Sequence, residues 1–189
     1  MLYEEEKLRL IYLARETEDY SLESHEFGSC SVLVPTKNHI LITPGKTKRF
    51  TLRTSDIIVL DRKGDVVENT NDNIIPNDVD FHIIAYEERD HDIDVIMHIN
   101  PQNASVRADE GNRIIFLSDC IDPDQYEPEK LLEVFRNSVK HRDYLLIKHS
   151  GILIVGNGVF DTLDKARYIE EIAKIKMPKE ENTILKKEN

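Results

Sequence analysis

Short apolar runs bounded by turn residues alternate with longer amphipathic stretches along this chain. Runs rich in Val, Ile and Leu between clusters of Pro, Gly, Asn or Asp predict β-strands. The first four runs follow one another along the chain with turn residues between them, such as Pro44-Gly45-Lys46, so they predict a meander of antiparallel strands. The predicted strands lie at residues 30–34, 39–43, 57–60 and 66–67, in the buried run that ends at 98–100, and at residues 113–117, 144–148 and 152–155.

In the longer stretches apolar residues recur at the spacing of an α-helix. One such stretch starts with Pro128 in its first turn, where the missing N–H is harmless. Together with the strands, these helices predict one α/β domain with several antiparallel strands and helices on the faces of the sheet. The predicted helices cover residues 4–20, 77–90, 102–108, 128–139 and 162–176, and the inward face of the first is predicted at Leu8, Ile11, Tyr12 and Arg15.

Length and composition set the class of protein. A chain of 189 residues fits one domain, predicted at residues 1–177, followed by a charged tail at residues 178–189. Two cysteines are too few for a disulfide scaffold, so we expect a reducing, cytoplasmic location. The chain has no apolar run of membrane-spanning length, and its formal net charge of -11 argues against broad binding to nucleic acid or anionic membranes.

A stretch between two prolines, at residues 76–101, carries the candidate chemistry. It begins with Asn77 and Asp78, both good helix N-caps, and ends in a strand with His98 and Asn100. Side chains two apart on a strand project to the same side, as a metal-binding pair requires. Asp78 has two competing interpretations, a helix cap or a catalytic base.

Three ordered signatures resemble the class II aldolase/adducin family. The first is E-F-G-S-C-S-V-L-V followed by H-I-L-I-T-P-G-K, at residues 26–46. The second is F-H-I-I-A-Y-E-E-R followed by M-H-I-N-P, and the third is L-L-I-K-H-S-G-I-L-I-V-G. The resemblance extends over roughly residues 4–175, which is almost the whole chain.

Membership would imply a three-layer α/β/α fold around a mostly antiparallel, mixed sheet, and assembly as a homotetramer. Many members of that family are zinc-dependent lyases, epimerases or dehydratases of phosphorylated sugars. Their metal holds substrate oxygens and stabilises an enediolate, while a Glu acts as acid and base. The adducin branch keeps the fold without this chemistry.

Carried over by motif, the family's metal ligands fall on altered residues. The first histidine falls on His98, the second on Asn100, and the third on Ser150, with His149 one place early. The catalytic Glu falls on Asp78, which keeps the carboxylate but is one methylene shorter. With two of three ligands replaced, the sequence argues against a tetrahedral zinc site of the usual kind.

The same resemblance implies a site for a substrate phosphate. Its residues in this chain are Gly28, Ser29, Thr43, Gly45, Lys46 and Asn77, with Ser29 in place of the family's Asn.

Three functions stay open at this point. The first is a divergent or non-catalytic protein that binds a small phosphorylated or carbonyl metabolite without a metal. The second is an aldolase, epimerase or dehydratase with one divalent metal, zinc by preference, in a rearranged site built from His98, His149 or His82, and Asp78. The third is an adducin-like scaffold that acts through its surface.

Overall fold

The computed structural model describes residues 2–19, 28–34, 36–89, 92–111 and 118–175. In this part of the chain eight strands form one sheet in the order β4-β3-β2-β1-β5-β8-β7-β6. Neighbouring strands are antiparallel except β6 and β7, which are parallel. The strands are β1 (Ser29–Val34), β2 (His39–Ile42), β3 (Ile58–Asp61), β4 (Val66–Glu68), β5 (Val95–Ile99), β6 (Ser118–Ile121), β7 (Tyr144–Ile147) and β8 (Gly151–Gly156).

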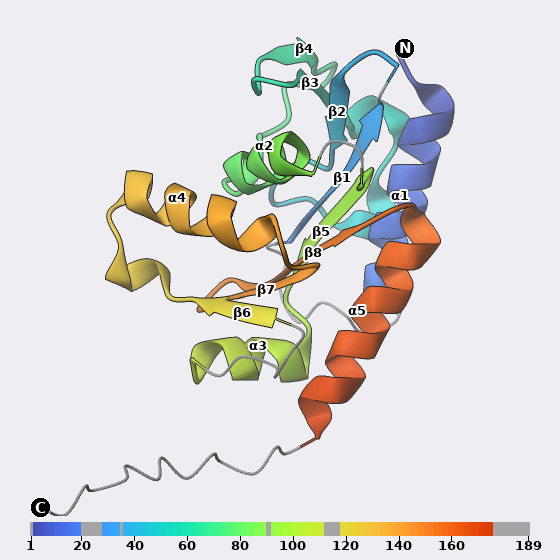
Figure 1. The fold of residues 1–189 in the computed structure, drawn as a ribbon. Helices are drawn as coiled ribbons and strands as arrows, with labels where there is room; N and C mark the ends of the chain where they lie inside the picture. Colours follow the sequence, from blue (N-terminus) through green and yellow to red (C-terminus); the bar gives the residue numbers. More distant parts are fainter. Residues whose placement is uncertain (1, 20–27, 35, 90–91, 112–117, 176–189) are drawn as a thin grey trace, which may run out of the picture.

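Helices cover both faces of the sheet and make a three-layer α/β/α domain (Figure 1). Helices α1, α3 and α5 pack on one face, and α2 and α4 on the other. Every residue of the central strand β5 is therefore buried, as expected for a strand covered on both sides. The helices are α1 (Glu4–Asp19), α2 (Val79–Glu88), α3 (Gln102–Asp109), α4 (Pro128–Val139) and α5 (Val159–Lys174), with short 3₁₀ turns η1 (Arg49–Thr51), η2 (Thr54–Asp56) and η3 (Pro123–Gln125).

The α/β fold class, the mixed sheet and the N-terminal meander are confirmed. Strands β1 to β4 are neighbours in chain order, joined by antiparallel pairs. The predicted strand at residues 113–117 and the predicted tail at 178–189 lie outside the described residues. Strand β6 was not predicted, because its sequence S-D-C-I reads as part of a polar turn and its pairing partner is distant in sequence.

The inward face predicted for the first helix was wrong in part. Leu8 and Tyr12 are 55% and 42% exposed, whereas Leu10 and Leu13 are fully buried. The segment K-L-R-L-I-Y-L-A offers two overlapping apolar stripes, and contacts with the sheet and α5 decide between them. The buried Lys7 belongs to the selected stripe because its ammonium group forms an ion pair with Glu68 on β4.

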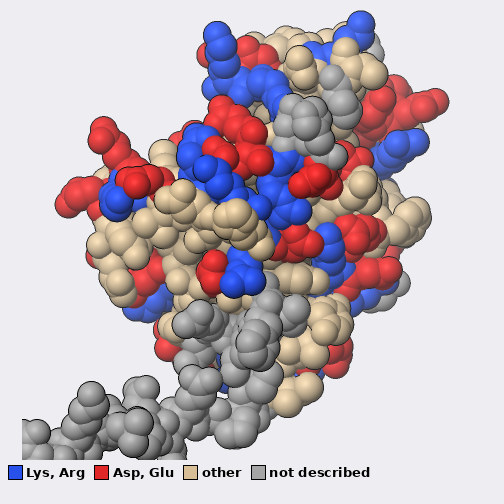
Figure 2. All heavy atoms as spheres, in the orientation of Figure 1, with Lys and Arg blue, Asp and Glu red and all other residues tan. Residues whose placement is uncertain are grey.

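The helices and the surface can be compared with what membrane or nucleic-acid binding would require. No helix within the described ranges is long and apolar enough to cross a membrane. On the face shown in Figure 2, lysines and arginines are interspersed with acidic residues.

Candidate functional site

A carboxylate at the start of α2 joins the ends of two strands. Ser29 of β1 lies opposite His98 of β5 in the antiparallel ladder. Asp78 accepts hydrogen bonds at Oδ2 from Ser29 Oγ (2.6 Å) and from His98 Nδ1 (2.5 Å). Asp78 does occupy the N-cap position of α2, but its side chain makes no capping bond. The expectation that its carboxylate caps the helix was therefore wrong, since the strands provide stronger donors.

A second histidine continues the network into the core. His82 is fully buried, with Nε2 lying 2.7 Å from Ser29 Oγ and Nδ1 lying 2.7 Å from Ser31 Oγ. Ser31 Oγ is 2.9 Å from the Tyr86 hydroxyl, which is 3.3 Å from the carbonyl oxygen of Asp94. From the sequence His82 was considered as a ligand of a rearranged metal site, and Ser31 and Tyr86 were not singled out. A usable signal existed, because polar groups at 29 and 31 share a strand side and those at 78, 82 and 86 share a helical face.

Donor counting fixes the direction of these hydrogen bonds. An ionised Asp78 can only accept, so Ser29 must donate to it and must itself accept from His82 Nε2–H. With neutral His82, Ser31 donates to Nδ1 and Tyr86 donates to Ser31. With charged His82, Ser31 donates to Tyr86, and Tyr86 donates to the carbonyl of Asp94. The network is thus satisfied in either protonation state, with the Ser31 and Tyr86 hydroxyls rotated differently in each.

The electrostatics favour an ionised carboxylate. Burial alone raises the pKa of Asp78, but hydrogen bonds and charge from His82 and His98 outweigh burial and hold that pKa far below its ordinary value. Burial raises the pKa of Tyr86 well above its ordinary value, so this phenol stays protonated and can donate. Asp78 is therefore an anionic acceptor with donors on two sides.

The other nitrogen of His98 faces a serine. Ser150 Oγ lies 3.2 Å from His98 Nε2. Ser150 is placed there by a tight turn in which His149 and Gly151 have positive φ angles of 62° and 93°. A Cβ atom at Gly151 would come within 2.2 Å of the Ile99 carbonyl oxygen, so glycine is what lets the start of β8 approach the end of β5.

His149 is turned away from His98. Its backbone N–H donates to Asp109 Oδ1 (2.8 Å), and its imidazole Nδ1 lies 3.4 Å from the same oxygen. Its Nε2 lies 3.9 Å from Asp124 Oδ2, and its side chain is 60% exposed.

The remaining position considered for the metal is Asn100. Its Oδ1 accepts a hydrogen bond from Ser105 (3.3 Å). Across the described ranges, no three His, Cys, Asp or Glu side chains gather as a metal site would require. The group beside His98 Nε2 is the neutral hydroxyl of Ser150, which suits zinc poorly, as does the amide at position 100. The residues present therefore do not fit the family's zinc centre.

The residues predicted to bind phosphate come together at one corner, beside Asp78. Cys30 N–H donates to Thr43 Oγ1 (3.0 Å), which joins the start of β1 to the Thr43–Lys46 segment. Gly45 N–H donates to Ile74 O (2.8 Å), and a Cβ at Gly45 would lie 3.3 Å from Pro76 Cα, next to Asn77. Lys46 and Asn77 are exposed. The Ser29 hydroxyl is directed to Asp78 and His82.

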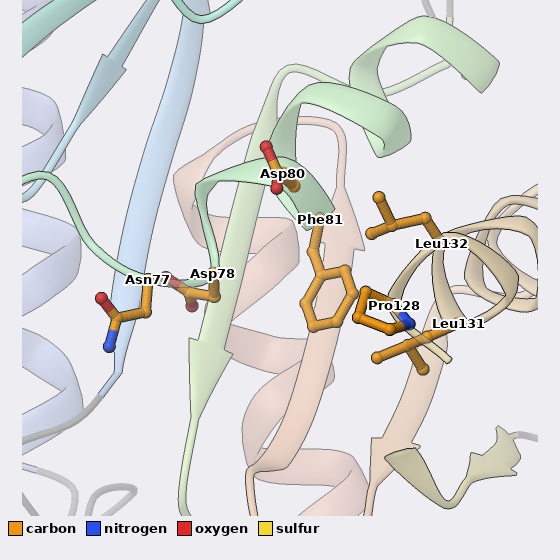
Figure 3. Close-up of a pocket in the computed structure, with 7 residues that line it drawn as sticks. All are labelled: Asn77, Asp78, Asp80, Phe81, Pro128, Leu131 and Leu132. Carbon is orange, nitrogen blue, oxygen red and sulfur yellow. The ribbon is translucent and has the colours of Figure 1, made fainter. Parts of the chain in front are cut away.

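A pocket of about 200 Å³ lies between the start of α2 and α4 and is bordered by Asn77 and Asp78 (Figure 3). Its wall is formed mainly by apolar side chains. Phe81 stacks on Phe135 with ring centroids 4.4 Å apart, and makes a T-shaped contact with the His98 ring at a centroid distance of 6.4 Å. The sequence analysis did not identify this pocket, because its residues come from two helices distant in the chain. They are Asn77, Asp78, Asp80, Phe81, Pro128, Leu131 and Leu132.

A mixed sheet between two helical layers, with a histidine at the end of β5 facing the α2 carboxylate, defines a protein of the class II aldolase type. The family model described as the Class II Aldolase and Adducin N-terminal domain matches residues 8–177. The chain therefore belongs to the class II aldolase/adducin family.

Individual relatives agree with this assignment. The chain is 24% identical over 178 residues to the L-fuculose phosphate aldolase of Methanocaldococcus jannaschii, covering 90% of this chain and 94% of that one. A solved L-fuculose 1-phosphate aldolase superposes with a TM-score of 0.80 at 24% identity, covering 92% of this chain and 85% of the other. The L-fuculose-1-phosphate aldolase of Thermus thermophilus gives a TM-score of 0.70 at 17% identity, with coverages of 88% and 94%. At these identities the solved structures establish the shared fold.

Proposed function

We propose that this protein is a divergent class II aldolase family member that binds a small phosphorylated or carbonyl metabolite without the family's metal. The observation that carries the proposal is the engagement of His98. Its Nδ1 is bonded to Asp78 and its Nε2 to Ser150, where the family pattern would place a further ligand. Hydrogen bonds thus occupy the position of the metal centre.

The corner next to Asp78 is the proposed phosphate site. The exposed Lys46 ammonium and Asn77 amide can supply donors to an anion. The anion would neighbour the Asp78–His98 pair, which leaves the other end of the ligand near a carboxylate and an imidazole. The names of the relatives, L-fuculose phosphate aldolases, support a sugar phosphate as the ligand class.

Thermal unfolding in the presence of EDTA tests this proposal. L-fuculose 1-phosphate and dihydroxyacetone phosphate serve as probes, and saturation at about 100 times Kd should raise Tm by about 5–10 °C. Lys46→Ala should abolish most of the shift, whereas Lys63→Ala, an exposed lysine in the turn before β4, should leave it intact. A panel of sugar phosphates that never raises Tm would contradict metabolite binding and favour a scaffold role.

One observation favours the metal-dependent alternative. Histidines that bind a metal through one nitrogen commonly donate the other N–H to a carboxylate, as His98 does to Asp78. If Ser150 moved aside, His98 Nε2 could serve as one ligand. Aldol cleavage of L-fuculose 1-phosphate that requires added zinc and is lost in His98→Ala would establish this alternative.

The family resemblance also supports self-association as a tetramer in the cytoplasm, with residues 1–177 as one domain. Light scattering on the purified chain tests the assembly, and a monomer mass would overturn it.

A further inference from the structure

We propose that Ser150 is a nucleophile, with His98 as its general base and Asp78 as the residue that positions His98. The proposed activity is hydrolysis of a small carboxylic ester. This inference goes beyond metabolite binding and does not need a phosphorylated ligand. It rests on the hydrogen-bonded series Ser150 Oγ–His98 Nε2 (3.2 Å) and His98 Nδ1–Asp78 Oδ2 (2.5 Å).

The series has the chemical order of a serine nucleophile site. Asp78 binds Nδ1 of His98, so Nε2 is the imidazole nitrogen that faces the Ser150 hydroxyl, as in a nucleophile and base pair. Asp78 accepts a hydrogen bond from Ser29, and Ser29 is hydrogen-bonded in turn to the buried His82. Asp78, His98 and Ser150 also follow one of the chain orders known for such triads, since these are recognised by geometry rather than by position.

His98 and Ser150 differ in burial, as catalysis by a serine nucleophile requires: the base is buried and the serine is partly exposed. His98 is 2% exposed, so the base is shielded from water. Ser150 is partly exposed, in a turn flanked by positive φ angles at His149 and Gly151. Unusual backbone conformations of this kind concentrate at functional sites. The serine is therefore reachable from outside, while its base is fixed from within.

The neighbouring pocket suggests the substrate class. It borders Asp78 and Phe81, and its other walls include Pro128, Leu131 and Leu132. The Phe81 and His98 rings make a T-shaped contact. A volume of about 200 Å³ with mainly apolar walls, bordered by the Asp78 that binds His98, suits a short acyl group better than a sugar.

The reaction balances without a cofactor. Ser150 Oγ bonds to the acyl carbon of the ester, and its proton passes to His98 Nε2 while the carbonyl electron pair moves to oxygen. Collapse of this adduct breaks the bond to the alkoxy group, which leaves with the proton from His98. A water molecule then attacks the acyl-serine and gives its proton to His98, and collapse of the second adduct breaks the bond to Ser150 Oγ, which takes the proton from His98 as the carboxylic acid leaves.

Covalent labelling tests the nucleophile directly. The purified full chain in EDTA is incubated with a biotin-linked fluorophosphonate, which bonds to an activated serine and loses fluoride. Intact mass and peptide mapping should place one label on Ser150. Ser150→Ala should abolish it, His98→Ala should slow it at least about 100-fold, and Ser138→Ala, a partly exposed serine on α4, should react like wild type.

Hydrolysis of p-nitrophenyl acetate distinguishes a role of Asp78 in positioning His98 from a role in folding. Asp78→Asn should lower kcat by more than about 10-fold and leave KM within about twofold, because the imidazole loses its favoured tautomer. If His98→Ala unfolds at a much lower temperature than wild type, His98→Gln replaces it in both assays. Absence of label from folded wild-type protein, or equal labelling of wild type and a folded His98 variant, would overturn the proposal. Sugar-phosphate binding does not depend on this result, since Ser150→Ala retains the residues of the phosphate corner.

Discussion

The two faces of β1 differ in kind: one packs into an apolar core, and the other carries the polar network that leads to the candidate site. Cys30, Val32 and Val34 face α1 and α5 and join a continuous apolar cluster. Ser29 and Ser31 face α2 and bind the fully buried His82. One six-residue strand therefore contributes apolar packing on one side and a polar network on the other.

The difference between the two faces of β1 indicates which part of the core serves the candidate site. Apolar packing tolerates exchange of one hydrophobic residue for another, whereas a buried polar group is costly unless each donor and acceptor has a partner. The network from Tyr86 to Asp78 meets that condition and ends at His98. Apolar side chains at these positions would need no matched donors and acceptors, so we interpret the polar network as support for the site.

The largest effect is expected on the apolar face. Leu10→Ala removes a fully buried side chain and should lower the free energy of unfolding by about 2–5 kcal/mol. Leu8→Ala, on the same helix but 55% exposed, should change it by less than about 0.5 kcal/mol. Urea denaturation measures both, and equal losses would contradict the buried face assigned to α1.

Next in size is the polar face. Ser31→Ala should cost about 1–3 kcal/mol, because it removes the partner shared by His82 Nδ1 and the Tyr86 hydroxyl. Both single variants lose the Ser31–Tyr86 hydrogen bond, so the double variant with Tyr86→Phe should be more stable than the sum of the single losses implies. Strict additivity would show that Ser31 and Tyr86 act independently.

A pH-dependent effect should single out Asp78. Its folded pKa lies below the ordinary value of 3.8, so the native state binds fewer protons than the unfolded state in acid. The resulting stabilisation is complete above the unfolded pKa and is lost as pH falls below it. Asp78→Asn should therefore flatten the acid limb of the stability curve below about pH 4, whereas the exposed Asp80→Asn should not. Unchanged acid unfolding in Asp78→Asn would contradict the assignment.

The smallest effect is expected at the surface. Lys130 and Glu133 form an ion pair on α4 with both side chains more than half exposed. Lys130→Ala should change the free energy of unfolding by no more than about 0.5 kcal/mol, since water and salt screen such a pair. A loss above about 1 kcal/mol in the same urea assay would mean that surface pairs rival the buried network.

Local pattern was enough to predict much of the fold. Short apolar runs bounded by turn residues predicted the β1–β4 meander, and Pro128 marked the start of α4. The choice between two stripes on α1 and the pairing of β6 with β7 depend on contacts between distant residues, which no local pattern contains. His98, Asp78 and Ser150 were recognised as positions from the family pattern. That they bond to one another follows from the register of β1, β5 and β8 and from the turn at Gly151.

Metal content tests the central claim that hydrogen bonds have replaced the metal at His98. Untagged protein, purified without chelator and dialysed against equimolar zinc, would be analysed by mass spectrometry beside His98→Ala. The account predicts far less than one metal per chain in both samples, because His98 Nε2 is held by Ser150. About one zinc per wild-type chain that disappears in His98→Ala would contradict it and restore the metal-dependent aldolase.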